Sequence, residues 1–110
     1  MGFRLAQKPT YEVAVTVTFP VDGGRVEKHQ FHARFKRLSQ TQIEATLAEK
    51  PSDRELLRDV LVGWRGVQDE DGKELDFTDE AREQVLDVYP MQPTLARAFL
   101  DSVLQAREKN

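Results

Sequence analysis

The chain has no cysteine among its 110 residues, and it has only one tryptophan and two methionines. Without cysteine it can form neither a disulfide nor a thiolate nucleophile, and a cysteine-ligated zinc site is excluded. No apolar run approaches the roughly 18–20 residues that a membrane-spanning helix requires. The first residues also lack the apolar segment of a secretory signal peptide, because Gln7, Lys8 and Pro9 interrupt it. These absences predict a protein of the cytoplasm.

The sequence also has no excess of positively charged residues. Lysine and arginine number 16 against 19 aspartates and glutamates, which gives a net charge of −3. Proteins dedicated to duplex DNA usually carry a basic face, so this balance argues against that class. Hydrophobic residues make up 39% of the chain and charged residues 32%. These proportions predict a single folded domain over residues 1–110, with a small core and a densely charged surface.

The motifs of common catalytic centres are also absent. The sequence has no Gly-x-Ser-x-Gly nucleophile elbow, no glycine-rich phosphate loop and no His-Glu-x-x-His zinc motif. Carboxylate pairs such as Asp79 and Glu83 have helical spacing, which is typical of surface charge. We therefore predict a protein that is not an enzyme, with no catalytic, metal-binding or cofactor-binding residues.

A β-hairpin is predicted over residues 10–37. From Tyr11 to Phe19 apolar and polar residues alternate, which is the pattern of a strand with one face in water. Pro20 is expected to end this strand, because proline donates no hydrogen bond to a ladder. Asp22-Gly23-Gly24 favours a tight turn, since glycine reaches positive φ without steric cost. A second alternating strand is expected from Val26 to Lys36.

Helical signals fill residues 38–110. Ser39 and Ser52 are each expected to cap a helix, with Gln42 and Glu55 as capping-box partners. The stripe formed by Leu56, Leu57, Val60, Leu61 and Trp64 extends the second helix toward a C-cap at Gly63 or Gly66.

A loop around Asp71-Gly72 is expected over residues 67–77, and Thr78 then caps a third helix. Its apolar face is expected at Ala81, Val85, Val88 and Tyr89. Pro90 ends that helix, and Pro93 opens the last one. The predicted fold class is therefore α+β. A flexible lead of residues 1–9 precedes an N-terminal β-hairpin, which packs against about four helices in a single domain.

Two patterns that suggest metal ligands have simpler interpretations. His29 and His32 have the spacing of a helical metal site, but on a strand their side chains point to opposite faces. The segment Asp69-Glu70-Asp71-Gly72 resembles part of a calcium loop. When Gly72 takes the glycine position of an EF-hand, Val67 and Thr78 occupy the end positions, where neither fits. We therefore expect two histidines on opposite faces of a strand, and an acidic turn that is exposed to solvent.

One group of apolar residues has two interpretations. The last helix has a broad apolar stripe, which either packs in the core or offers a face to a partner, and Trp64 presents the same choice. The candidate partner-binding residues are Trp64, Leu95, Phe99, Leu100, Val103 and Leu104.

Several features, taken in order, resemble one protein family. They are Phe31 and Phe35, Val60-Leu61-Val62-Gly63-Trp64, Gly66-Val67, Asp69-Glu70-Asp71-Gly72 with Phe77, Tyr89-Pro90 and the final Lys109-Asn110. In this order they are similar to the small tail assembly chaperones of long, non-contractile-tailed (siphovirus-like) bacteriophages and prophages. The resemblance covers most of the chain from the hairpin onward.

The resemblance implies a non-enzymatic assembly factor in the cytoplasm of the host bacterium. Its expected partner is the tape measure protein, a long helical protein that it would keep soluble before the tail tube polymerises. It would be absent from the mature virion. Many such chaperones have a longer form made by a −1 ribosomal frameshift, and Lys109-Asn110 fits the second half of a slippery heptamer, A-AAA-AAC. The exposed apolar surface that this role requires also favours homo-oligomers.

Two alternatives stay open from the sequence. A small nucleic-acid-associated or regulatory phage protein would use the basic face of the hairpin, at His32, Arg34, Lys36 and Arg37. A structural tail component would stay in the particle. If the family resemblance does not hold, the sequence supports an α+β interaction domain of unknown partner.

Overall fold

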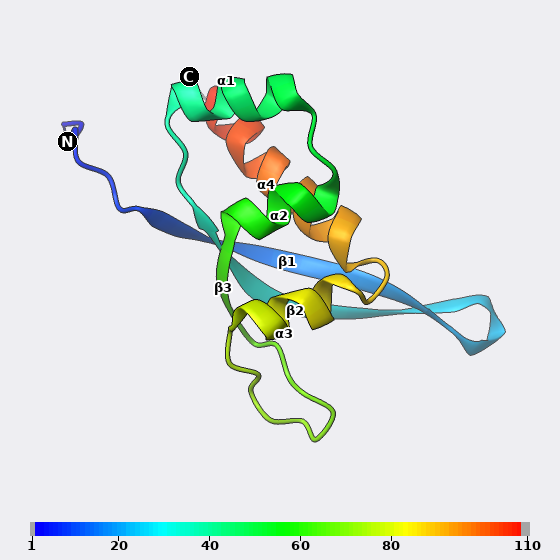
Figure 1. Cartoon of the computed structure of the whole chain (residues 1–110). Helices are drawn as coiled ribbons and strands as arrows, with labels where there is room; N and C mark the ends of the chain where they lie inside the picture. Colours follow the sequence, from blue (N-terminus) through cyan, green and yellow to red (C-terminus); the bar gives the residue numbers. More distant parts are fainter. Residues whose placement is uncertain (1, 109–110) are drawn as a thin grey trace.

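The protein contains one three-stranded antiparallel sheet within its described residues (Figure 1). The computed structural model describes the backbone of residues 2–108 and the side chains of residues 2–104. Strand β1 (Thr10–Val21) pairs with β2 (Arg25–Lys36) along its whole length, through a short 3₁₀ turn η1 (Asp22–Gly24). Strand β3 (Leu61–Arg65) pairs with the other side of β2. The spatial order β1-β2-β3 leaves β1 as an edge strand.

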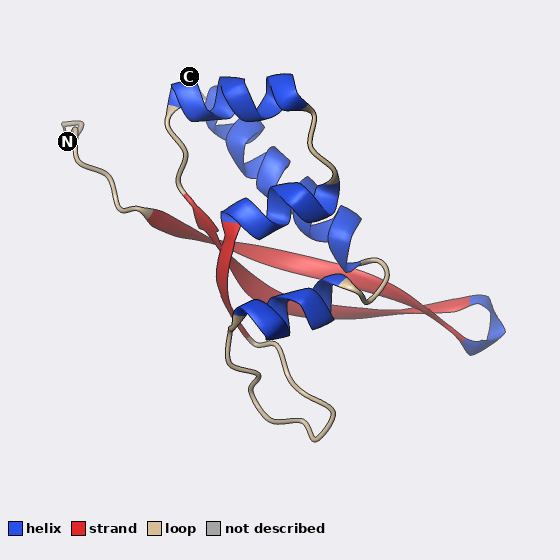
Figure 2. Ribbon diagram, in the orientation of Figure 1, coloured by secondary structure: helices blue, strands red, loops and turns tan. Residues whose placement is uncertain are grey.

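The described residues also form four α-helices: α1 (Gln40–Glu49), α2 (Asp53–Val60), α3 (Asp79–Leu86) and α4 (Met91–Glu108). The sheet packs against α2 and α4. This antiparallel sheet with its N-terminal hairpin and the four helices confirm the predicted α+β class. The turn end of the hairpin projects past the helices (Figure 2), and the molecule measures 49 Å along its longest axis. In the described part of the chain no helix has both the length and the apolar character to cross a membrane.

The core lies between the alternate face of the hairpin and helices α2 and α4. The ring of Phe35, on β2, has no solvent exposure, and its centroid lies 5.3 Å from that of Phe99 on α4. Leu57 of α2 and Leu95 of α4 are equally inaccessible. The odd-numbered residues of the two hairpin strands supply this face, as the predicted alternation requires.

Pro20 lies inside β1, so the prediction that it ends the strand is wrong. The backbone N–H of Arg37 donates to the carbonyl oxygen of Pro9 at 2.8 Å, next to the Thr10–Lys36 pair. Hydrogen-bonded and non-hydrogen-bonded pairs alternate in an antiparallel ladder. The odd residues of β1 therefore bond to β2, and the even residues direct their N–H and C=O groups toward the free edge. Pro20 is even-numbered, so its missing N–H removes no bond from the ladder.

Helix α2 ends at Val60, and the residues predicted to continue it form β3 instead. Leu61 has extended dihedral angles, φ −85° and ψ 109°, and its side chain is buried opposite Phe35. A Cβ atom on Gly63 would lie 3.3 Å from Arg34 Cβ, so glycine permits the close approach of β3 to β2. Gly66, with φ of 83°, then turns the chain away. Gly63 and Gly66 thus serve strand pairing and a turn rather than a helix C-cap.

The third and fourth helices differ from expectation at the residues between them. Helix α3 ends at Leu86, which is buried, while Val88 and Tyr89 lie beyond it and are 48% and 78% exposed. They are therefore not part of an apolar helical face. Helix α4 begins at Met91, so Pro93 lies within its first turn instead of opening it. The predicted caps at Ser39, Ser52 and Thr78 are confirmed.

Candidate functional site

Helix α1 lies near the second half of α4 and the start of α2 (Figure 1), and an apolar groove lies between these helices. This α1/α4 groove has a volume of about 370 Å³. Buried Leu56 and Phe99 close its inner side, and Thr46, Lys50 and Asp53 are the polar residues of its lining. The accessible apolar residues that line it are Leu38, Ile43, Leu47, Pro51, Leu100, Val103 and Leu104.

Helix α1 covers one side of the groove but is only loosely attached to the protein. None of its residues is buried, and Leu47 remains 49% exposed. The helix is capped at its N-terminus by the reciprocal hydrogen bonds of Ser39 and Gln42. At its end Lys50 has a left-handed φ of 48°, and Pro51 prevents continuation. Its caps therefore define α1, and none of its side chains is part of the core.

The structure brings three of the six predicted partner-binding residues to this groove with accessible side chains. Leu100 and Val103 are partly buried, and Leu104 is 45% exposed. Leu95 and Phe99, at 0% and 3% exposure, belong to the core, so for them the core-packing interpretation is the right one. The stripe of α4 therefore changes role along its length, from core to groove.

Trp64 lies on β3 and does not line the groove. Its indole Nε1 donates to the carbonyl oxygen of Leu75 at 2.7 Å, and its ring packs edge-on to Phe77 with centroids 4.7 Å apart. These contacts hold the loop that follows β3 against the sheet. The tryptophan thus stabilises the fold of this loop and is not placed with the other candidate partner-binding residues.

Sequence reasoning did not assign the α1 side of the groove. Ile43 and Leu47 have i, i+4 spacing, which predicts a narrow apolar face on this helix but does not indicate what lies against it. The signal that could have identified them is the contrast between this narrow pair and the polar remainder of α1. A helix with so little apolar surface can contribute little to a core.

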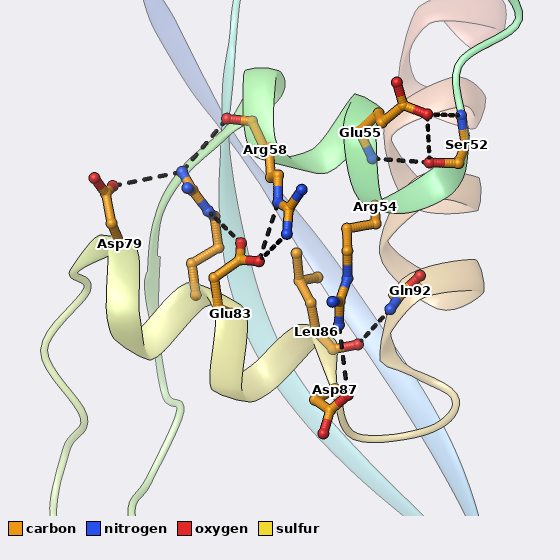
Figure 3. A network of polar contacts seen from close by, with 10 residues as sticks. Ser52, Arg54, Glu55, Arg58, Asp79, Glu83, Leu86, Asp87 and Gln92 are labelled. Atoms are coloured by element: carbon orange, nitrogen blue, oxygen red, sulfur yellow. Dashed lines mark hydrogen bonds and ion pairs between the residues drawn. The ribbon is translucent and has the colours of Figure 1, made fainter.

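Polar contacts hold α3 against α2 (Figure 3). Arg58 of α2 donates from Nε to Glu83 of α3 at 3.0 Å, and Arg82 reaches the same carboxylate at 3.4 Å. The hydrogen bond from Arg58 lowers the pKa of the Glu83 carboxyl below its ordinary value. Gln92 of α4 donates to the carbonyl oxygen of Leu86 at 2.7 Å and joins α3 to the helix that follows. Arg58 and Arg82 pair with Glu83 at the protein surface, and these pairs account for the lowered pKa. We therefore assign the network a structural role.

Two basic residues of the hairpin, Arg34 and Lys36, are paired with acids. Glu12 accepts hydrogen bonds from Arg65 Nη2 at 2.7 Å and from Arg34 Nη2 at 3.4 Å. The bond from Arg65 is the main reason that the pKa of Glu12 is lowered. Lys36 lies 3.3 Å from Asp59. Because the Glu12 carboxylate is shared by two arginines, this pairing reduces the free positive charge of the open face only in part.

The remaining basic residue of that group, Arg37, stacks on the ring of Tyr11 at 5.0 Å and donates to the carbonyl oxygen of Lys8. His32 lies on the open face of β2 beside Arg34. His29 lies on the opposite face, where its Nε2 is 2.9 Å from Glu27 and its ring packs edge-on to Phe19.

The acidic turn is stabilised by hydrogen bonds between its own residues. Asp69 Oδ1 accepts hydrogen bonds from the N–H groups of Asp71 and Lys73, at 2.9 and 3.0 Å, and Gly72 has a φ of 78°. This carboxylate is therefore used to form the turn. Across the described residues, histidines and carboxylates do not gather in groups of three that could hold a metal ion.

Comparisons with known proteins identify no relative of this chain. Family models, curated proteins and solved structures all give no match to the chain. The resemblance to tail assembly chaperones therefore stays a prediction from the sequence. The physical features that bear on function are the α1/α4 groove, its loosely attached helix and, away from the groove, the charge pairs on the sheet and between α2 and α3.

Proposed function

We propose that this protein is a non-enzymatic phage tail assembly chaperone. It binds the tape measure protein in the host cytoplasm, keeps it soluble until the tail tube polymerises, and is absent from the finished virion. The observation that carries the proposal is the α1/α4 groove, which is apolar, open to solvent and bordered by a loosely held helix.

The shape and lining of the groove suit an amphipathic helix. Helix-in-groove recognition places apolar residues at i, i+3, i+4 and i+7 of the ligand against an apolar cleft. Leu100, Val103 and Leu104 repeat along α4 with this same spacing, and Leu47 faces them from α1. A client helix would bury these side chains together with its own apolar stripe. That stripe is the part of a tape measure protein that otherwise aggregates.

The attachment of α1 supports the same role. A client helix is wider than the gap between two packed helices, so the groove has to widen to admit it. Because α1 buries no residue of its own, its displacement exposes the apolar lining of the groove, including Leu56 and Phe99 on its inner side. The client then covers this surface again.

The charged surface supports solubility of the complex. Charged residues make up 32% of the chain, and most of those on the sheet and on α3 are paired in the folded protein. Such a surface stays hydrated when the groove is filled. The same pairing weakens the nucleic-acid alternative, because a phosphate backbone requires unpaired cations.

Co-expression with the large helix-rich protein encoded immediately downstream tests the proposal. The measurements are the soluble fraction of that protein and its co-purification with this chain. The native chain is expected to form a complex that survives moderate salt, because apolar burial drives it. Leu104→Asp and Leu47→Asp are expected to lose the complex, since both side chains are exposed in the groove and both substitutions leave the core intact.

Val26→Asp is the matched control. Val26 is 59% exposed near the hairpin turn, away from the groove, so this variant should still bind the client. Equal loss in all three variants, or a folded native chain that never binds, would contradict the proposal. Binding that weakens steeply with salt would favour the nucleic-acid alternative. Detection of the chain in purified virions by mass spectrometry would favour a structural tail component.

A further inference from the structure

The free edge of β1 is a second surface with unused binding capacity. The ladder pattern directs the backbone N–H and C=O groups of Glu12, Ala14, Thr16 and Thr18 away from β2. Within the described residues no strand lies on this side of β1. Every second residue of a long strand therefore presents a donor and an acceptor that only solvent or another chain can pair.

The usual protections of an edge strand are weak here. Natural edges carry lysines, prolines or bulges that prevent pairing with another strand. The register of β1 with β2 is unbroken from Thr10 to Val21 and contains no lysine. The only charged residue of β1, Glu12, is drawn toward β2 and β3 by Arg34 and Arg65. Pro20 protects just the end of the strand near the turn.

The strand is also complementary to itself. Antiparallel pairing about a two-fold axis at Val15 would set residue 10 against residue 20, so that nearly the whole strand overlaps. Ala14 would then exchange hydrogen bonds with Thr16 of a second copy, and Glu12 would face Thr18 instead of another carboxylate. Even residues would pair with even residues, so the apolar odd residues of both copies would stay on the core side.

The helix beside this edge offers a matching surface. A groove of about 600 Å³ separates Val13–Thr16 from one side of α4. Small side chains line the α4 side at Thr94 and Ala98. Arg97 and Asp101 also line it, and they pair with each other within α4, with Arg97 Nε 3.2 Å from Asp101 Oδ1. Under the same two-fold axis the two α4 helices run antiparallel.

From these features we propose that the protein forms a symmetric homodimer through the free edge of β1, which joins two three-stranded sheets into one continuous sheet. The occupant of this edge is a second copy of the same chain. The unused backbone groups supply the pairing, and the overlap of the strand with itself about Val15 sets the direction. The inference is independent of the client groove, which lies on the α1 side of α4.

The first measurement is the mass of the native protein by sedimentation equilibrium over a wide range of concentration. A reversible dimer is expected. Thr16→Pro is expected to raise the dimer Kd by at least about tenfold, since it removes an outward N–H group without removing a bond to β2. Thr16→Val keeps that N–H and should dimerise like the native chain. A monomer at every concentration, or a dimer that Thr16→Pro does not weaken, would overturn the proposal.

A further readout holds even if Thr16→Pro fails to fold. In hydrogen-exchange NMR, the outward amides of Ala14, Thr16 and Thr18 should become protected as the native protein dimerises. Amides that exchange as fast in the dimer as in dilute protein would place the interface elsewhere. None of these measurements uses the client, so their failure is distinct from failure of the chaperone proposal.

Discussion

The hydroxyl of Tyr11 donates a hydrogen bond to Ser102 Oγ at 2.7 Å and joins the first strand to the last helix across 91 residues of sequence. Ser102 directs its own proton to the carbonyl oxygen of Phe99 at 2.6 Å, so its oxygen is free to accept. The bond lies beside the packed rings of Tyr11, Phe35 and Phe99. It therefore closes the end of the core that β1 and α4 share.

Removal of this hydroxyl tests the link between β1 and α4. Tyr11→Phe keeps the ring and is expected to lower the free energy of unfolding by about 1 kcal/mol, the usual net value of one hydrogen bond. Urea unfolding followed by circular dichroism measures the change. Tyr89→Phe is the control, because Tyr89 is 78% exposed and should give no shift. A loss of the same size in both variants would mean that the Tyr11 bond contributes nothing specific.

The two halves of the α4 stripe should differ in stability measurements. Phe99→Ala removes a ring with 3% exposure and is expected to cost about 3–5 kcal/mol, because a cavity remains in the core. Leu104→Ala removes a side chain with 45% exposure and should cost about 0.5 kcal/mol or less. Similar costs for both would show that the groove end of α4 is packed like the core.

The parts of this fold that the sequence predicts are those decided by local chemistry. The alternation from Tyr11 to Phe19 determines which strand face is buried, and the Ser39 and Ser52 boxes mark helix starts, because each depends on neighbours within a few residues. Strand β3 escaped prediction. The run from Val60 to Trp64 satisfies helical spacing, and its pairing with β2 is a long-range contact that no local pattern records.

The candidate site was predictable to a similar extent. The apolar spacing of α4 identified Leu100, Val103 and Leu104, but spacing alone could not separate them from Leu95 and Phe99, which continue the same stripe. Burial depends on where the sheet ends beneath the helix. The position of α1 opposite α4 is likewise set by the length of the hairpin and the turn at Lys50 and Pro51, not by any motif.

The two capping boxes offer a matched test of how firmly α1 is attached. Ser52→Ala should lower the free energy of unfolding by about 1 kcal/mol, because α2 carries the buried residues Leu57 and Val60. Ser39→Ala removes the same kind of cap from a helix with no buried residue. We expect it to speed amide exchange in α1 with little change in global unfolding. An equal global loss from both variants would mean that α1 is integral to the core.

Gly66 is expected to resist substitution. Its φ of 83° is left-handed, and an added Cβ would lie 3.6 Å from both Cα and Cβ of Phe31. The added methyl group therefore fits, and the expected loss of stability comes from the left-handed backbone conformation. Gly66→Ala should destabilise the protein by about 1–2 kcal/mol in urea unfolding. Gly2→Ala, at an open position without a positive φ, is the control and should have no effect. A neutral Gly66→Ala would indicate that this turn can adopt another conformation.

Acid should weaken the contact between α2 and α3. The hydrogen bond from Arg58 lowers the pKa of Glu83 in the folded protein below its ordinary value of 4.5. Because the unfolded chain takes up this proton first, the pair stabilises the protein above the ordinary pKa. The contribution is lost as pH falls through the lowered folded pKa. Glu83→Gln should therefore melt below the native protein at neutral pH, and the two melting temperatures should converge in acid.

Thermal unfolding from neutral pH down to about pH 3 measures this convergence. Glu70→Gln is the control, since Glu70 is exposed in the loop after β3 and forms no ion pair within the described residues. Its melting temperature should follow that of the native protein at every pH. A gap between Glu83→Gln and the native protein that stays constant into acid would show that Glu83 acts through packing. In that case the Arg58 pair would not be the contact that holds α3 in place.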